Sequence, residues 1–482
     1  ISRMKPEKLA RMQAAIHSDD GDSLLARLLR STGRGALRHG KLVLVGFAVV
    51  FALSVAGITQ IQINDNPTRW FKSDHRIRVA DEVLNRHFAG TYDAWMVLDH
   101  VDRPDGALLA ERVEPALAAA PAGVREFWRE LAPAADETLD GERLTGLISA
   151  LEDRLFDADG AAVEALEALL RAVESVASEA KYFQQPEVLR WIAALQADLE
   201  ASGLVGKSNA LPDLVKTVNR ELRSGEPEDY RIPERSAGVA QALLQFQSSH
   251  RPQDLWHMVT PDFSRAVVWL QLPSGDNQDM TAVIEHVDAY LEQHPLPAGM
   301  ALQWAGKTYL NVVWQEAMVQ GMLGSLASAF LAVLIMMTIL FRSFGYGLLA
   351  MLPLTITITF IYGLIGWIGK DYDMPIAVLS ALTLGLSIDF AIHFIERSRE
   401  ALAKLGDFRA AMAEVFEEPA RAISRNAIVI AVGFTPLLLA PLVPYITVGV
   451  FLASIMAVSA LVTLVLLPAA MQPFLAARKS AA

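Results

Sequence analysis

The chain has 482 residues, of which 52% are hydrophobic and 20% are charged, with a net charge of −12 and no cysteine. This composition excludes an intrinsically disordered chain, and the acidic balance argues against a nucleic-acid-binding protein. Without cysteine the chain has no disulfide, no thiolate nucleophile and no cysteine-ligated metal site. The apolar residues are concentrated in long uncharged runs, one near the N-terminus and five in the last third of the chain.

These runs are long enough to cross a membrane, because a hydrocarbon core about 30 Å thick requires roughly 20 apolar helical residues. A buried helix of a soluble protein could explain one run, but not five that are joined by short links. The first run follows a basic stretch, and we interpret it as a retained anchor, not as a cleaved signal peptide. We predict six transmembrane helices, at 42–58, 318–341, 345–368, 374–396, 426–444 and 446–471.

Lysine and arginine residues indicate the orientation of these helices, because they are enriched in short cytoplasmic flanks. Basic residues gather in the predicted N-terminal segment 1–41, at Arg342, in the loop 397–425 and in the tail 472–482. The alternate flanks carry almost none. Both termini are therefore predicted to be cytoplasmic, and residues 59–317 to form an extracytoplasmic domain.

The pattern within 59–317 is that of a mixed domain. The strand-like run 94–99 is complemented much later by a strand at 265–272, a helix at 280–293 and a strand at 300–304. Strand, helix and strand in this order predict an α+β sandwich of split βαβ type. The segment at about 105–200 is rich in Ala, Leu and Glu, and we predict a helical insertion there. Its helices could pack on the sandwich or present a coiled-coil face to a partner.

No motif in the sequence indicates a cofactor. There is no glycine-rich phosphate loop, so ATP is not the expected energy source, and no HExxH or histidine-rich cluster that would hold a metal. His250 and His257 are isolated histidines in predicted loops. We expect neither a cofactor nor a metal site.

The fourth predicted span and its end carry the ionisable residues of interest, in the sequence LGLSIDFAIHFIERSRE. Asp389 lies about 22 Å along the helix from Met374, in the cytoplasmic half of the membrane. His393 follows one turn later, and Glu396 and Glu400 continue the same helix face. An ionisable side chain at this depth is costly and is therefore expected to be functional, and imidazole can exchange a proton near neutral pH. We predict a proton relay of Asp389 and His393; the alternatives are that both only hydrogen-bond neighbouring helices, or that they bind an ion.

Other polar residues in the spans give weaker indications. Ser387, Glu396, Asn426 and Thr435 could support the relay, and so could the threonines of the third span. Hydroxyl groups in helices also bond to backbone carbonyls, which is the alternative for them. Small residues can let helices approach closely, and three glycines are candidates for this packing role: Gly385, Gly433 and Gly449.

One span, a large external domain, five clustered spans, the FRS sequence between the second and third spans, and GLSIDFAIHFIERSRE together resemble one half of a resistance-nodulation-division (RND) superfamily transporter. Within that superfamily the chain is most similar to MMPL-type exporters, a branch that includes exporters of hopanoids and other lipids. The resemblance covers about residues 24–475. Asp389 matches the relay position of the family, and His393 matches the histidine that follows it in this branch.

The resemblance implies a bacterial inner-membrane transporter, not an enzyme, with two homologous halves, twelve spans and two periplasmic porter domains. Only one half is present here, so it implies a second six-span half as partner, a higher oligomer as a further state, and an inter-half linker at 1–41. The implied function is that of a C-terminal half of a proton-motive-force-driven exporter of lipids or other hydrophobic compounds. The alternatives are a sterol-sensing-like lipid receptor without proton-driven turnover, and a structural half or assembly factor.

Overall fold

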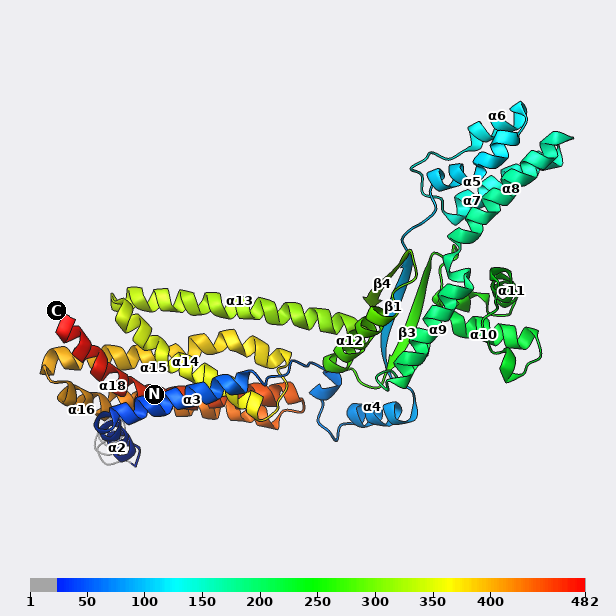
Figure 1. Cartoon of the computed structure of the whole chain (residues 1–482). Coiled ribbons are helices and arrows are strands. Elements are labelled where there is room, and N and C mark those ends of the chain that lie inside the picture. Colours follow the sequence, from blue (N-terminus) through cyan, green and yellow to red (C-terminus); the bar gives the residue numbers. More distant parts are fainter. Residues whose placement is uncertain (1–23, 482) are drawn as a thin grey trace, which may run out of the picture. The chain divides into compact units, whose positions relative to one another are not determined.

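The computed structural model describes residues 24–481, apart from the side chains of 323, 380–382 and 477–481. The first 23 residues of the predicted linker 1–41 lie outside the described residues. The chain forms two compact units (Figure 1). The helical unit consists of the chain up to Val79 together with Val313–Ala482, and the sheet unit consists of Ala80–Val312.

Six helical stretches of the described chain are long and apolar enough to cross a membrane, which is the number that the sequence predicts. The fifth is divided into two helices and a 3-10 segment. The elements of the first span and its surroundings are α2 (Leu24–Arg38), α3 (Gly40–Ile58), η1 (Pro67–Trp70) and α4 (Arg76–His87). The later elements are α13 (Lys307–Phe341), α14 (Phe344–Trp367), α15 (Met374–Leu405), α16 (Phe408–Glu417), α17 (Pro419–Phe434), η5 (Thr435–Leu439) and α18 (Val443–Ala481).

The predicted loop 397–425 is largely helical in the structure. α15 continues to Leu405 because its polar end is rich in Ala, Leu, Glu, Lys and Arg, which are good helix formers. Gly406, at φ 71°, then ends α15. The Asp407 side chain accepts a hydrogen bond from the Ala410 amide at 2.8 Å and so begins α16. This end of the helical unit is therefore a folded surface of helices.

α3 packs against α14 through small residues. A Cβ atom on Gly366 would lie 1.8 Å from the Gly57 carbonyl oxygen, and one on Gly363 would lie 2.5 Å from the Ser54 backbone. The Trp367 indole donates a hydrogen bond to the Leu53 carbonyl at 3.0 Å. Close packing of this kind holds helices together in lipid, where no hydrophobic driving force acts between them. The two backbones are in direct contact at this crossing.

The glycines that the sequence suggests for packing behave differently. Cβ atoms on Gly385 and Gly433 would meet nothing within 4 Å among the described residues, so neither glycine packs closely against another helix of this chain. Gly449 does lie in a tight contact, 2.7 Å from the Leu437 side chain of η5. The reason is orientation, because Gly385 and Gly433 both lie on exposed faces of their helices.

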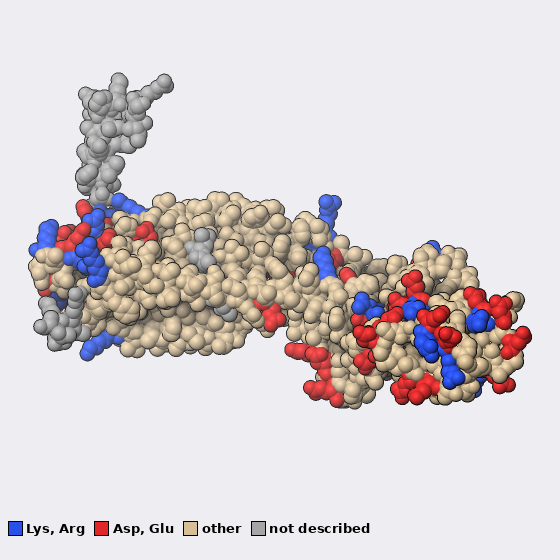
Figure 2. Space-filling model, turned by 90° about the horizontal axis from the view of Figure 1, so that it is seen from above, with Lys and Arg blue, Asp and Glu red and all other residues tan. Residues whose placement is uncertain are grey.

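The core of the helical unit lies between α14, α15 and α18, which all pack on one another. Fully buried side chains from these helices include Leu354, Phe390, Phe394 and Leu467. The face of the unit seen in Figure 2 has a broad band with few acidic or basic side chains, and charged side chains of both signs gather at the end where α2 and α16 lie. This distribution is typical of a protein that crosses a lipid bilayer.

The sheet unit contains one antiparallel sheet of four strands in the order β2-β3-β1-β4. Helix α12 joins β3 to β4, and β1 lies between them, which is the order of a split βαβ unit. The strands are β1 (Tyr92–His100), β2 (Lys207–Asn209), β3 (Arg265–Leu272) and β4 (Met300–Ala305). The helices and 3-10 segments are α5 (Gly106–Ala119), α6 (Ala122–Leu131), α7 (Gly141–Phe156), α8 (Ala161–Ala180), η2 (Tyr182–Gln184), α9 (Pro186–Ala201), α10 (Leu211–Leu222), η3 (Pro227–Asp229), α11 (Ser236–Gln247), η4 (Pro252–His257) and α12 (Asn277–Gln293).

Alternate residues of the central strands point into the core of the sheet unit. Met96 and Leu98 on β1 and Val268 and Leu270 on β3 are buried, and they pack with apolar residues of α9 and α12. Their period of two is the pattern from which the strands are predicted. The sheet therefore buries one face under helices.

Helices α5–α8 form the insertion and have an apolar core of their own, which includes Leu147 of α7 and Leu169 of α8 (Figure 1). α8 packs on α5 and α7, not on the sheet. The insertion predicted at about 105–200 is shorter in the structure, because α9 contributes Leu189 and Ile192 to the core under the sheet. The two ends of the insertion meet: the His100 ring stacks on the Tyr182 ring with centroids 4.2 Å apart.

Candidate functional site

Asp389 and His393 lie one turn apart on α15, with 3.4 Å between the Asp389 Oδ1 and His393 Nε2 atoms. The direction of both side chains is set by the opposite face of the helix, where Phe390, Ala391 and Phe394 are buried in the core. The side chains of Asp389 and His393 are 52% and 59% exposed. A carboxylate and an imidazole at this separation can share or exchange a proton.

The pair belongs to a stripe of α15 that the described helices leave uncovered. Val378, Gly385, Asp389, His393 and Glu396 are all exposed, and their spacing places them on one helix face. Asp389 therefore points away from the other described spans of this chain. The physical reason is that the apolar face of α15 packs against α14 and α18, so the polar face points outward.

Ser387 is not brought to the pair. It is fully buried on the other side of α15, where its carbonyl oxygen accepts a hydrogen bond from the Ser459 hydroxyl of α18 at 3.3 Å. Its own hydroxyl has no hydrogen-bond partner among the described residues, and the same is true of the buried hydroxyls of Thr357 and Thr463. Thr463 is one turn from Ser459, and nothing in the sequence distinguishes it from an ordinary residue of a span.

The remaining predicted support residues are separated along the helices. Glu396 is exposed on the same face as the pair, and Asn426 is exposed on α17. Thr435 begins η5, and its hydroxyl donates a hydrogen bond to the Val432 carbonyl at 2.7 Å. Asn426 and Thr435 are about 14 Å apart along the helix axis, so at most one of them can contact the pair directly.

Two threonines of the third span bond to backbone carbonyls of their own helix, which is the alternative that the sequence suggests for hydroxyl groups. The Thr355 hydroxyl donates to the Met351 carbonyl at 2.9 Å, and the Thr359 hydroxyl donates to the Thr355 carbonyl at 2.7 Å. Both side chains are thus bonded within α14. These two hydroxyls are engaged in their own helix.

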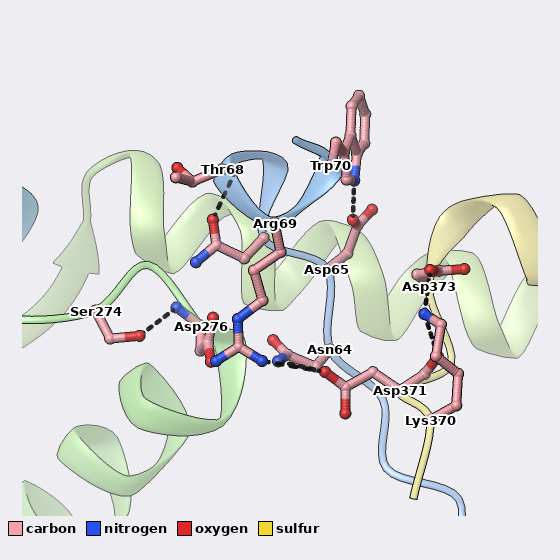
Figure 3. A network of polar contacts seen from close by, with 11 residues as sticks. Asn64, Asp65, Thr68, Arg69, Trp70, Ser274, Asp276, Lys370, Asp371 and Asp373 are labelled. Carbon is pink, nitrogen blue, oxygen red and sulfur yellow. Dashed lines mark hydrogen bonds and ion pairs between the residues drawn. The ribbon is translucent and has the colours of Figure 1, made fainter. Parts of the chain in front are cut away.

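A second polar cluster, which we call the sealed cluster, joins the segment after α3 to the loop between α14 and α15 (Figure 3). The Asn64 amide donates a hydrogen bond to Asp371 Oδ2 at 3.0 Å, and Arg69 Nη1 lies 3.5 Å from the same oxygen. The backbone joins the same two segments, because the Tyr372 amide donates to the Gln62 carbonyl at 2.8 Å. Segments that are far apart in the chain are held together here.

Asp65 is the buried acid of the sealed cluster. The Trp70 indole donates a hydrogen bond to Asp65 Oδ1 at 2.9 Å. Burial raises the pKa of the Asp65 carboxyl, the Trp70 hydrogen bond opposes this, and the nearby Asp373 carboxylate raises the pKa further. Asp373 itself pairs with Lys370 at 2.8 Å and accepts a hydrogen bond from the Ile376 amide at the start of α15.

Sequence reasoning does not find the sealed cluster. The available signals are the DNPTRW sequence after the first span and KDYD between the third and fourth spans, which are short polar stretches next to long apolar ones. In the part of the chain that the structure describes, no group of three or more His, Asp or Glu side chains is arranged to hold a metal ion. Each of the three carboxylates Asp65, Asp371 and Asp373 has a side-chain partner within the sealed cluster.

The comparisons with known proteins agree with the resemblance. The model of the MMPL family matches residues 166–479, which is more than half of the chain. A relative from Methanocaldococcus jannaschii, the "Putative membrane protein MJ1562", is 28% identical over 209 residues, which are 43% of this chain and 54% of the relative. The chain thus spans about half the length of this relative. The chain belongs to the MMPL family, and it is a multi-pass membrane protein of the RND transporter type.

Proposed function

We propose that this chain is one half of a proton-motive-force-driven exporter, which moves lipids or other hydrophobic compounds out of the inner membrane. The observation that carries the proposal is the Asp389–His393 pair, 3.4 Å apart on an uncovered face of a membrane-spanning helix. A charged pair that faced lipid permanently would be costly. The face therefore needs a polar or protein environment, which a transporter uses to load and release protons.

The pair can couple protons to helix movement through its charge. With Asp389 ionised and His393 protonated the pair is a compact ion pair, and gain or loss of one proton leaves a net charge that favours water over a packed helix. Each protonation state thus favours a different arrangement of the helices around α15. One proton that moves through 100 mV provides about 2.3 kcal/mol, which is sufficient to bias such an equilibrium.

We further propose that a second six-helix half covers the polar stripe of α15. The stripe contains small and polar residues, Gly385 among them, so another helix could approach closely at this position. The basic residues of α2 and α16 support a cytoplasmic location for that end of the helical unit. The sheet unit would then be the periplasmic porter domain that handles the substrate.

The relay is tested by Asp389→Asn, which removes the titratable group and keeps the shape of the side chain. The protein, purified from its native membrane with its partner half, is reconstituted in proteoliposomes that contain NBD-labelled phosphatidylethanolamine and a pH-sensitive dye. We expect proton-dependent lipid transfer to fall to the level of empty liposomes. The matched control is Glu414→Gln, which removes one exposed carboxylate of α16 and should leave transfer unchanged.

Two outcomes would contradict the proposal. Undiminished, still proton-driven transfer by Asp389→Asn would exclude the relay. Binding of the labelled lipid without transfer by the unmodified protein, at any pH gradient, would favour a lipid receptor over an exporter.

The partner half is tested by cross-linking, for which the absence of native cysteine is an advantage. Gly385→Cys and Val378→Cys place thiols on the polar stripe, and Leu331→Cys places one on an exposed apolar face of α13. A benzophenone maleimide attached to each thiol in native membranes inserts on illumination into C–H bonds of whatever chain lies beside it, and it should give a product of higher mass from the two stripe positions. Cross-linking at Leu331→Cys with none at the stripe would show that the partner covers another face.

A further inference from the structure

The cytoplasmic end of the helical unit contains an open cavity of about 1480 Å³ between α2, α3, α16 and α18. Its lining is strongly basic. Arg34 and Arg38 of α2, Lys41 of α3 and Arg409 of α16 all contribute to it, whereas Glu417 is the single acidic residue among its described lining residues. Neither the relay nor the sealed cluster includes any of these side chains.

α2 presents its basic side chains to the cavity because of its amphipathic sequence. Arg27, Arg30, Arg34 and Arg38 recur at helical spacing and occupy one face. The opposite face carries small and apolar residues that are buried against α16 and α18. Gly33 lies so close to Phe416 that a Cβ atom would be 2.7 Å from its ring. The helix is thus held on the surface of the spans with its arginines in a row.

Four of the basic side chains that line the cavity have no carboxylate partner among the described residues: Arg34, Arg38, Lys41 and Arg409. Arg34 Nε donates to the Arg30 carbonyl at 3.3 Å, which leaves its charge unopposed. Arg38, Lys41 and Arg409 form no ion pair with any residue of the described chain. Several cations gathered around one open cavity repel one another, and an anionic ligand would relieve this repulsion.

The cavity also has an apolar wall. Leu42 and Leu44 at the start of α3 line it, together with Phe416 of α16 and Ala469 of α18. Leu42 is 74% exposed, and it begins a span that runs into the apolar band of the helical unit. A small anion would leave this wall in contact with water, and a neutral lipid would leave the cations unopposed. The lining fits a molecule with an anionic head and apolar chains.

We propose that this cavity binds an anionic glycerophospholipid of the cytoplasmic leaflet. Its phosphate lies between Arg34, Arg38 and Arg409, which can donate paired hydrogen bonds to phosphate oxygens. Its acyl chains follow Leu42 and Leu44 along α3 and α18. The bound lipid ties α2 to the spans, because the headgroup contacts α2 and α16 together.

The site is tested by native mass spectrometry of the full chain in detergent. The probes are dioctanoyl-phosphatidylglycerol, dioctanoyl-phosphatidylcholine and inorganic phosphate, each titrated separately. We expect adducts of the anionic lipid at concentrations at least tenfold below those needed for phosphatidylcholine, and no displacement of the lipid by phosphate. Equal binding of both lipids, or displacement by phosphate at similar concentration, would overturn the proposal.

Variants locate the binding in the cavity. Arg34→Gln/Arg38→Gln should weaken binding of dioctanoyl-phosphatidylglycerol by about 30-fold, since each basic residue near an anionic headgroup contributes about a fivefold change in affinity. Arg409→Gln, an exposed residue outside α2, should weaken it about fivefold and serves if the double variant does not fold. The control Arg397→Gln/Lys404→Gln removes the same charge from the exposed end of α15. A loss of affinity in this control as large as in the double variant would show that only net charge matters.

Discussion

The sealed cluster and the Asp389–His393 pair both place carboxylates in the helical unit, and they differ in what surrounds them. In the sealed cluster, Asp371 accepts from Asn64 and Arg69, and Asp65 accepts from Trp70. Asp389 contacts His393 on its own helix, and both side chains are more than half exposed. One group of polar residues is therefore complete within the chain, and the other is open to an additional partner.

The difference indicates different roles. A buried polar network whose members bond to one another stabilises one arrangement of the segments that it joins. A pair that is open on one side can change its partners and its protonation without breaking the fold. The sealed cluster is a brace between the end of α3 and the start of α15, and the open pair is where we expect the moving parts to meet.

The largest effect is expected where the chain is packed most tightly. Gly363→Leu forces a side chain into the Ser54 backbone and should destabilise the protein by about 3 kcal/mol, the upper part of the usual range for overpacking. Gly385→Leu, on the open stripe of α15, meets nothing and should change stability by less than about 0.5 kcal/mol. The measurement is the unfolding midpoint of the purified chain in detergent. Similar losses in both variants would mean that the stripe is packed within the chain.

A smaller loss of stability is expected when a carboxylate is removed from either group. Asp371→Ala removes the hydrogen bond from the buried Asn64 amide to Asp371 and should cost about 1.5 kcal/mol in the same unfolding experiment. Asp389→Ala removes a largely exposed side chain and should cost less than about 0.5 kcal/mol. If Asp389→Ala destabilised the isolated chain as much as Asp371→Ala, the contrast between a sealed and an open group would be wrong.

The smallest effect concerns the pH dependence of the sealed cluster. Burial raises the pKa of Asp65 in the folded chain, so the folded state holds its proton more tightly than the unfolded state. The stabilisation from this group is present below the unfolded-state pKa and is lost as pH rises through the raised folded-state pKa. Asp65→Asn, which keeps an acceptor for Trp70, should remove this decline. The measurement is the difference in unfolding midpoint between the two proteins from pH 4 to pH 7, and a constant difference would contradict the expectation.

Local patterns in the sequence account for much of the fold. Six apolar runs predict six spans, and the alternation in β1 and β3 predicts the strands, because both signals depend on neighbouring residues alone. The end of the insertion is missed because α8 and α9 are both amphipathic helices rich in Ala and Leu. Only the packing partners differ, and these are not visible in the periodicity.

The candidate site could be predicted in part. The spacing of one helical turn predicts that Asp389 and His393 lie side by side on one helix, and α15 places them so in the structure. The outward direction of the pair depends on which face of α15 packs in the core, and the sealed cluster depends on a contact between Asn64 and Asp371 across 307 positions. Contacts of this kind arise from tertiary packing, and a single sequence carries no local signal for them.

The stack of His100 on Tyr182 has a consequence for the order of folding. It brings the two ends of the α5–α8 insertion together, and that insertion has a core of its own. During synthesis β1 emerges long before its neighbour β3, which begins at Arg265. If the insertion folds while it emerges, it closes a large part of the loop between these strands in advance. β1 is then held near the point at which β3 will arrive, with a shorter loop left to close.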